Sequence, residues 1–183
     1  MITLRTAKPE DASKLLAIYT PYVLNTAVTF ELEVPTKEEF AARIQNTLCN
    51  FPYLVAEDQG EILGYAYASA FKSRAAYDWA VETSIYVRDG FHGRGLGRML
   101  YTELERLLKK QHIYSLNACI TYPNDESIRF HEKMGYTLCA HFHESGYKMG
   151  MWRDIVWMEK HLTRENPPQS VIPFGELKGE EHT

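Results

Sequence analysis

The sequence has few cysteines, and their placement excludes the structures that cysteines usually support. Cys49, Cys119 and Cys139 are the only three, and no Cys-x-x-Cys pair occurs. An odd, scattered set of thiols is typical of reduced cysteines rather than of a disulfide framework or a zinc site. We therefore expect a cytoplasmic protein.

Long apolar runs, glycine–proline tracts and an excess of basic residues are also missing. No apolar run approaches the roughly 18 residues that a membrane-spanning helix needs, and the N-terminus lacks the apolar core of a signal peptide. The 11 glycines and 8 prolines are too few for a disordered or fibrous chain. The formal net charge of −4 argues against a nucleic-acid surface spread over the domain. We expect neither a membrane nor a nucleic-acid partner.

The composition predicts one globular domain. The chain has 183 residues, of which 45% are hydrophobic and 24% are charged, close to the globular average. The segment from Asn166 onward holds three prolines and several acidic residues. We expect a single domain over residues 1–165 and a loosely packed tail over residues 166–183.

Hydrophobic periodicity predicts alternating strands and helices. Strands are expected at residues 2–6, 53–57, 62–71, 80–87, 116–121, 136–142 and 151–160. A loop is expected over 25–35. Mixed strands and helices in this order indicate an α/β (α+β) fold with one layered core around a mixed sheet.

Local signals place the helices between these strands. One helix is expected from Pro9 to about Tyr19, where Pro21 helps to end it. Thr36 and Glu39 have the spacing of a capping box at the start of the second helix. A long amphipathic helix follows a glycine cluster, and a last helix runs from about 125 to 134, with Asn124 as its cap and Gly135 as its stop.

The glycine cluster at residues 92–97 reads His-Gly-Arg-Gly-Leu-Gly and precedes the long helix. Glycines let the backbone approach a ligand closely, and the free N–H groups of a helix start suit a phosphate. Arg98 argues against a dinucleotide fingerprint, and no Gly-Lys-Ser/Thr follows to make a Walker A loop. From the pattern alone, an ordinary glycine-rich turn that caps a helix remains an alternative.

Residues 87–100 resemble the acyl-CoA-binding motif of the GNAT acetyltransferases, Gln/Arg-x-x-Gly-x-Gly/Ala. Gly95 and Gly97 match this motif, and His92 departs from it at the first position. Residues 27–31, 71–87, 123–136 and 146–157 resemble phosphinothricin N-acetyltransferases, and the similarity extends over nearly the whole chain. It implies a single GNAT-type domain with a mixed, twisted sheet and helices on both faces. It also implies acetyl-CoA as cofactor, a homodimer and a small amino-acid substrate of the phosphinothricin, methionine sulfone or methionine sulfoximine type.

The resemblance also implies which residues bind the cofactor. The main chain of the strand end is expected to pair with the pantetheine arm, as an added strand would. The glycine loop is expected to hold the pyrophosphate, and two residues at the start of the last helix are expected to bond to coenzyme A. From the pattern alone, Asn124 needs no role beyond capping. The implied cofactor residues are Ile85, Tyr86, Val87, His92, Gly93, Arg94, Gly95, Leu96, Gly97, Arg98, Asn124 and Ser127.

Glu82 is the candidate general base. It lies in an otherwise apolar strand and, with a period of two, shares a face with Ser84 and Tyr86. If that face is buried, desolvation raises the pKa of Glu82 toward neutrality, which suits a base. From the pattern alone, a carboxylate on a solvated strand face is the more common explanation. The resemblance implies the catalytic glutamate, acting through water.

His131 is the second catalytic candidate. Its spacing from Ile128 and Met134 places it on the apolar side of its helix, where a lone histidine is usually a core residue. The resemblance implies a role either in proton transfer or in holding the substrate, and the residues do not separate these roles.

The substrate is expected to contact residues from three segments. Lys72, Arg74 and Tyr77 precede the strand of Glu82, and we interpret them as a clamp for the α-carboxylate of the substrate. A solvated loop is the alternative for these three. Phe30 and Glu31 resemble the family's substrate wall, and Ser84 shares the face of Glu82.

Two histidines and two other functions remain to be weighed. His141 and His143 share a strand face, but no third ligand has a convincing spacing, so we expect surface or interface residues and no metal.

One alternative function is a GNAT enzyme for an aminoglycoside, a polyamine or a protein N-terminus. The other is a non-catalytic acyl-CoA sensor, which the presence of both Glu82 and His131 argues against.

Overall fold

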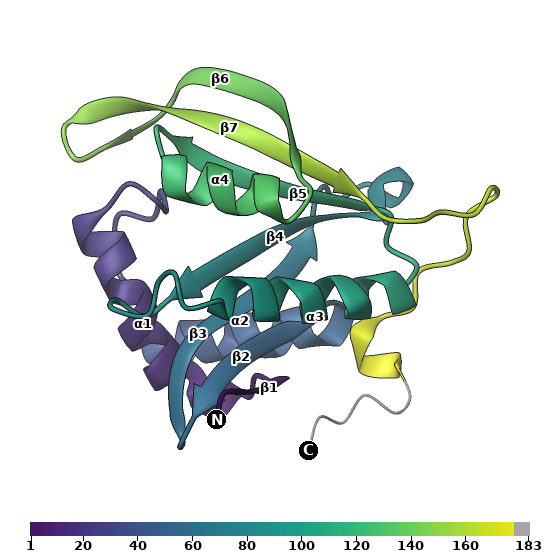
Figure 1. Ribbon diagram of the computed structural model, residues 1–183, viewed down its shortest axis with the longest axis horizontal. Coiled ribbons are helices and arrows are strands. Elements are labelled where there is room, and N and C mark those ends of the chain that lie inside the picture. The colour runs from purple at the N-terminus through teal and green to yellow at the C-terminus, as the bar shows by residue number, and fades with distance from the viewer. Residues whose placement is uncertain (178–183) are drawn as a thin grey trace.

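The computed structural model describes residues 1–177 (Figure 1). Seven strands form one sheet in the order β1-β2-β3-β4-β5-β7-β6. The strands are β1 Thr3–Thr6, β2 Tyr53–Asp58, β3 Glu61–Ala70, β4 Ala80–Val87, β5 Ser115–Tyr122, β6 Thr137–Lys148 and β7 Met151–His161. The helices are α1 Ala12–Asn25, α2 Lys37–Asn50, α3 Leu96–Lys110 and α4 Asp125–Lys133. Within residues 1–177 there are also three short 3-10 helices, at Pro9–Asp11, Ala75–Tyr77 and Phe174–Glu176.

The centre of the sheet is open because two parallel strands separate. Every neighbouring pair is antiparallel except β4 and β5. In the described residues these two strands pair at three positions, Ala80↔Ser115, Val81↔Leu116 and Glu82↔Asn117. Both strands continue well beyond this point, so they diverge after Glu82 and leave a gap in the middle of the sheet (Figure 1).

Helices cover both faces of the sheet, as the sequence predicts. On one face, α1 and α2 pack Leu15 and Ile44 against the rings of Tyr53 and Tyr65. On the other face, α3 packs a row of leucines against alternate residues of β2, β3 and β4. Figure 1 shows α3 in front of the sheet and α2 behind it. None of the described helices is both long and apolar enough to cross a membrane.

The predicted start and stop signals are confirmed. Thr36 Oγ1 accepts the N–H of Glu39 at 3.2 Å, and the Thr36 N–H donates to the Glu39 carboxylate at 2.8 Å. The Asn124 side chain accepts the N–H of Ser127 at 3.2 Å at the start of α4. Gly135 follows α4 with φ +88°, a left-handed conformation that ends a helix and favours glycine.

Two predicted boundaries are wrong. Pro21 does not end the first helix: α1 includes it and continues to Asn25. Pro21 lacks only its own N–H donor, while the next turn is retained because Val23 is buried and the Tyr22 ring packs edge-on against Tyr86. The sixth strand is also longer than predicted and runs to Lys148, because it pairs with β7 along most of its length.

The C-terminal segment is attached more firmly than a loosely packed tail. Gln111 Nε2 donates to the carbonyl of Ile172 at 2.7 Å, and the Ile172 N–H donates to the carbonyl of Gln111 at 3.1 Å. The indole N–H of Trp79 donates to the Gln169 carbonyl at 2.7 Å. Val171 and Phe174 pack against the α3 side of the core. Residues 178–183 of the predicted tail lie outside the described residues.

Candidate active site

Two cavities adjoin where β4 and β5 diverge. The first, here called the glycine-loop cavity, has a volume of about 400 Å³ and lies between the end of β4, the 90–95 loop and the starts of α3 and α4. The second, here called the tyrosine cavity, has a volume of about 740 Å³ and lies under α1 and α2. Val28 lines both cavities. A ligand that fills the first cavity can therefore present its end to the second through the gap in the sheet.

The glycine loop exposes backbone toward the first cavity. Gly93 and Gly95 have φ +73° and +82°, and a Cβ atom at either one would meet nothing within 4 Å. Gly95 caps α3, and the first helical bond runs from the Met99 N–H to its carbonyl at 3.0 Å. The N–H groups of Leu96, Gly97 and Arg98 precede this bond and lack helical acceptors, so they suit an anion.

Gly97 has a different role from its neighbours. A Cβ atom there would lie 2.9 Å from Cε2 of Phe130, which belongs to α4. This glycine therefore permits the close approach of α3 and α4, and both helices line the cavity.

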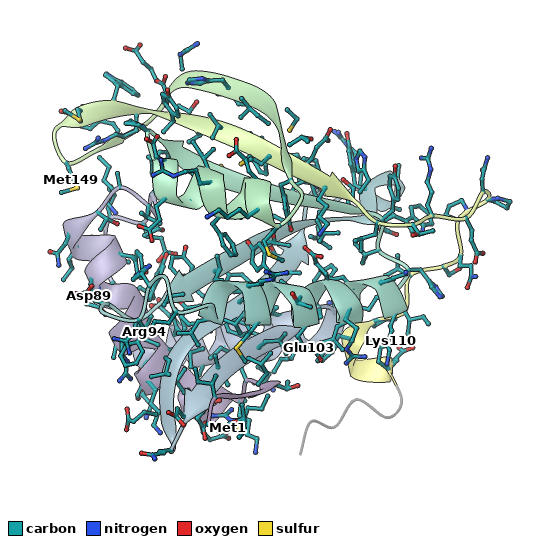
Figure 2. All side chains as sticks on the ribbon, viewed as in Figure 1. Met1, Asp89, Arg94, Glu103, Lys110 and Met149 are labelled. Atoms are coloured by element: carbon teal, nitrogen blue, oxygen red, sulfur yellow. The ribbon has the colours of Figure 1, made fainter. Side chains whose placement is uncertain are left out.

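The charges around the glycine-loop cavity fit an anionic cofactor. Arg98, Lys133 and His92 line it. Arg94 does not, because its guanidinium lies over the Phe91 ring at 4.8 Å from the centroid. Figure 2 labels Arg94 at the loop before α3. Glu126 also lines the cavity, with its carboxylate 3.6 Å from the His92 ring. Open space beside glycine, free N–H groups and the positive charges of Arg98 and Lys133 are features that suit a nucleotide pyrophosphate.

Most of the predicted cofactor residues lie together. The cavity is lined by Ile85, Val87, His92, Gly93, Gly95, Leu96, Gly97, Arg98, Asn124 and Ser127. Tyr86 instead faces the tyrosine cavity, because it alternates with Ile85 along β4. The carbonyl of Val87 accepts a hydrogen bond from the Tyr22 hydroxyl at 2.6 Å. This carbonyl is therefore already occupied, whereas the sequence analysis expected the main chain of Val87 to pair with the cofactor.

Glu82 lies on the wall of the tyrosine cavity, on the same face as Ser84 and Tyr86, as the strand period predicts. Burial raises the pKa of its carboxyl, and the positive charge of Lys72 offsets part of this shift. A carboxylate in this state accepts a proton more readily than an ordinary glutamate. Glu82 is also the last residue of β4 that pairs with β5, so it stands where the two strands begin to separate.

The loop that carries Phe30 and Glu31 is held in place over the tyrosine cavity. Lys148 Nζ donates to the Thr29 carbonyl at 2.7 Å, and the hydroxyls of Tyr19 and Thr29 lie 2.7 Å apart. The Phe30 ring lies against Gly146, where no Cβ atom would fit. Both Phe30 and Glu31 line the cavity, and their contact with a substrate stays a prediction.

The tyrosine cavity contains groups that the sequence analysis did not identify. Arg43 on α2 is bonded to the Glu31 carboxylate at 2.6 Å, and both line the cavity. The rings of Tyr19, Tyr53, Tyr65 and Tyr67 surround it. Burial raises the pKa of Tyr19 to about 12 and raises that of Tyr67, so both hydroxyls keep their protons and remain donors. The aromatic enrichment of residues 53–67 was the available signal for this wall.

The proposed carboxylate clamp does not line either cavity. Lys72, Arg74 and Tyr77 are exposed on the segment before β4. Lys72 is near enough to act on Glu82 electrostatically, while its ammonium lies 4.8 Å from the Phe71 ring centroid. Although the three residues are close to Glu82 in sequence, none of their side chains reaches the wall of either cavity.

His131 is a core residue and lines neither cavity. Its predicted role in proton transfer or in holding the substrate stays a prediction, because its side chain does not reach a cavity wall. Its side chain is 3% exposed, and burial lowers its pKa, so the imidazole is neutral at neutral pH. Nδ1 donates to the Ser127 carbonyl at 2.8 Å, and Nε2 lies 3.1 Å from the Tyr101 hydroxyl. His131 thus joins α4 to α3 behind Ser127, which does line the glycine-loop cavity.

The chain is similar to known acetyltransferases along most of its length. Residues 4–157 match a family model described as an acetyltransferase (GNAT) domain. The chain is 35% identical over 176 residues to a phosphinothricin N-acetyltransferase of Streptomyces viridochromogenes, with 96% of each chain covered. It is 31% identical over 170 residues to an L-methionine sulfoximine/L-methionine sulfone acetyltransferase of Salmonella typhimurium, with 92% of this chain and 99% of that protein covered.

A solved structure agrees with these similarities. The crystal structure of a GNAT superfamily phosphinothricin acetyltransferase from Sinorhizobium meliloti, in complex with acetyl-CoA, superposes with a TM-score of 0.88 at 34% identity. The superposed region covers 94% of this chain and 96% of the Sinorhizobium meliloti chain. The segment matched by the family model includes every residue that lines the two cavities.

Proposed function

Because the chain belongs to the GNAT acetyltransferase family, we propose that it acetylates the amino group of a small amino acid of the phosphinothricin, methionine sulfone or methionine sulfoximine type. The enzyme is an acetyl-CoA-dependent N-acetyltransferase. The observation that carries the proposal is the position of Glu82, a desolvated carboxylate on the wall of the tyrosine cavity where β4 and β5 separate. The names of the relatives support the substrate class.

In our proposal the glycine-loop cavity holds the cofactor, which when bound supplies an acetyl thioester. The N–H groups of Leu96, Gly97 and Arg98 bind its pyrophosphate, and the side chains of Arg98 and Lys133 balance its charge. Ile85 and its neighbours at the unpaired end of β4 guide the pantetheine arm toward the gap between β4 and β5. Asn124 and Ser127, at the start of α4, form the wall of the cavity on the other side of this arm.

Glu82 removes the proton that the substrate ammonium must lose before it attacks. Its raised pKa makes it a stronger base than an exposed glutamate, and a water molecule can relay the proton. Within a ternary complex the neutral amine would form the amide C–N bond as the thioester C–S bond breaks, and the second amine proton would pass to the departing sulfur, so that coenzyme A leaves as its thiol. Cys119 also lines the tyrosine cavity, but burial raises its pKa to about 11, so its thiol stays protonated and is a poor nucleophile.

The tyrosine cavity suits an amino acid that carries a polar tetrahedral group. The protonated hydroxyls of Tyr19 and Tyr67 are donors for phosphinyl or sulfonyl oxygens. Arg43 adds a positive charge at the exposed side of the cavity wall, where it is paired with the Glu31 carboxylate. The positive charge of Lys72 acts on Glu82 from outside the cavity wall. Because Lys72, Arg74 and Tyr77 are exposed and line neither cavity, we assign them no direct contact with the substrate.

His131 enters our proposal as a positioning residue. Its bond to the Ser127 carbonyl holds the first turn of α4, and its contact with Tyr101 ties that turn to α3. It thereby sets the width of the glycine-loop cavity, which lies between these two helices.

The experiment that tests the function is thiol release from acetyl-CoA with a panel of amines. The panel contains L-phosphinothricin, methionine sulfone, methionine sulfoximine, ordinary amino acids, a polyamine, an aminoglycoside and a peptide with a free N-terminus. We expect the first three to give the highest kcat/KM. Faster release with the polyamine, the aminoglycoside or the peptide would contradict the proposed substrate class.

We also propose that the enzyme is a homodimer formed through the β6–β7 hairpin. Six large apolar side chains on this edge of the sheet are at least half exposed: Leu138, Phe142, Tyr147, Met149, Met151 and Trp152. Figure 2 labels Met149 at the hairpin tip. Such a patch favours self-association. Light scattering should give the dimer mass for the native chain and the monomer mass for Trp152→Glu, whereas a native monomer would contradict this.

The compartment we propose is the cytoplasm. Cys49, Cys119 and Cys139 are all free thiols, and such cysteines are typical of a reducing environment.

A further inference from the structure

A cluster of two imidazoles and a carboxylate lies on the β6–β7 hairpin, outside both cavities. His141 Nε2 lies 2.8 Å and His143 Nδ1 lies 2.9 Å from the same oxygen of Asp154, Oδ2. One ligand atom from each of the three residues lies within 4.8 Å of the others. The three side chains therefore converge on one point, with two coming from β6 and one from β7.

The backbone holds these groups in this arrangement. The register between β6 and β7 shifts between Phe142 and Gly146, so His141 precedes the bulge and His143 lies within it. Within the bulge, Glu144 has φ +50° and its N–H donates to Asp154 Oδ1 at 2.9 Å. This bond fixes one carboxylate oxygen and turns the other, Oδ2, toward both imidazoles. The His141 ring also packs on the Tyr122 ring, at 4.8 Å between centroids.

We propose that His141, His143 and Asp154 form a binding site for one divalent transition-metal ion of the zinc type. Two imidazole nitrogens and one carboxylate oxygen are a recognised three-ligand set, with the fourth tetrahedral position open to water. Imidazole favours zinc, copper and nickel over magnesium or calcium. A main-chain N–H that orients the ligating carboxylate is typical of the outer contacts that support metal ligands.

The site is separate from the chemistry of acetyl transfer. Asp154 precedes Ile155, which lines the tyrosine cavity, and successive side chains of a strand point to opposite faces. The ion would therefore bind on the other face of β7 and would link β6 to β7 across the bulge. Its expected effect is on the hairpin, so binding can be measured directly and without reference to activity.

The test is calorimetric titration of the full chain with Zn²⁺, alongside His143→Gln, Asp154→Asn and the control His161→Gln. His161 is a matched control because it lies on the same strand, with only Glu159 at 3.7 Å as a carboxylate neighbour. The native chain and the control should bind one equivalent. His143→Gln and Asp154→Asn should each weaken binding at least tenfold. His143 is largely exposed, so its variant should remain folded even if Asp154→Asn does not.

Co²⁺ used in place of Zn²⁺ separates this site from the free cysteines. Thiolate ligands give an intense near-ultraviolet charge-transfer band that imidazole and carboxylate ligands do not give. We expect Co²⁺ to bind without that band. The proposal is overturned if no stoichiometric binding occurs, if the thiolate band dominates, or if His143→Gln binds as tightly as the control.

Discussion

The basicity of Glu82 follows from its position at the end of the paired part of β4. Up to this residue β5 covers the strand edge, and beyond it the sheet is open. The carboxyl is therefore partly removed from water while it still faces a cavity that admits a substrate. Desolvation penalises the charged form and raises the pKa, and the positive charge of Lys72 acts in the opposite direction.

A charge change at Lys72 should move the pH dependence of catalysis. Glu82 acts as a base only when ionised, so kcat/KM should fall as the pH drops through its raised pKa. Lys72→Met removes the charge that lowers this pKa, so the acidic limb should shift to higher pH. Lys72→Arg retains the charge and should leave the limb in place. Measuring kcat/KM from pH 5 to 9 for both variants tests this, and a shift to lower pH in Lys72→Met would contradict it.

Individual residues differ in how well the sequence alone could place them. The face of Glu82 and Ser84 was predictable because a strand has a period of two. Arg43 was not, since it reaches the tyrosine cavity from α2, a helix that is distant in sequence from β4. The cluster formed by His141 and His143 with Asp154 was also hidden, because the register of β6 and β7 and its bulge decide which residues meet.

At the scale of elements, the start of α3 combines two constraints on glycine. Gly95 adopts φ +82° to begin the helix, and the space beside it is open toward the cavity. Gly97 has an ordinary φ but no room for a Cβ atom, because Phe130 of α4 lies against it. The first glycine serves the ligand and the second serves the packing of two helices.

Gly95→Ala should weaken acetyl-CoA binding as well as stability. A left-handed conformation costs a non-glycine residue about 1 kcal/mol, and the new methyl group would enter the space that we assign to the pyrophosphate. Gly60→Ala is the matched control, because Gly60 also has φ +82° and open space but lies in the β2–β3 turn. Equilibrium binding should show a larger Kd for Gly95→Ala alone. An equal effect of both variants on Kd would contradict the assignment.

The order of elements was predictable, whereas some of their ends were not. Capping residues such as Thr36 and Asn124 act through local bonds that a sequence motif encodes. The end of α1 depends instead on tertiary packing, because burial of Val23 maintains a helical turn beyond Pro21. The length of β6 likewise depends on its partner β7.

At the scale of the whole molecule, the site exists because distant segments meet at the gap in the sheet. The glycine-loop cavity joins the end of β4 to the starts of α3 and α4, and the tyrosine cavity joins α1, α2 and β3 to the same strand. Periodicity predicts each element, but it does not predict how far β4 and β5 separate.

The C-terminal segment after Glu165 should contribute to the free energy of unfolding of the whole domain. Ending the chain after Glu165 removes hydrogen bonds from Trp79 and Gln111 to this segment and exposes core surface under Val171 and Phe174. At about 1 kcal/mol for each net hydrogen bond, the free energy of unfolding should fall by about 2 kcal/mol or more. Urea unfolding of the shortened and complete chains measures this difference. Equal stability would show that these contacts contribute nothing.

The central claim is that Glu82 removes the substrate proton from the wall of the tyrosine cavity, and Glu82→Gln tests it most directly. The amide keeps the size of the side chain but cannot accept the proton. Turnover with the best amine of the panel and the Kd for acetyl-CoA should be measured on the same preparation. The account predicts a loss in kcat of about 10²–10⁴-fold with an unchanged Kd. Unchanged turnover at neutral pH would contradict it.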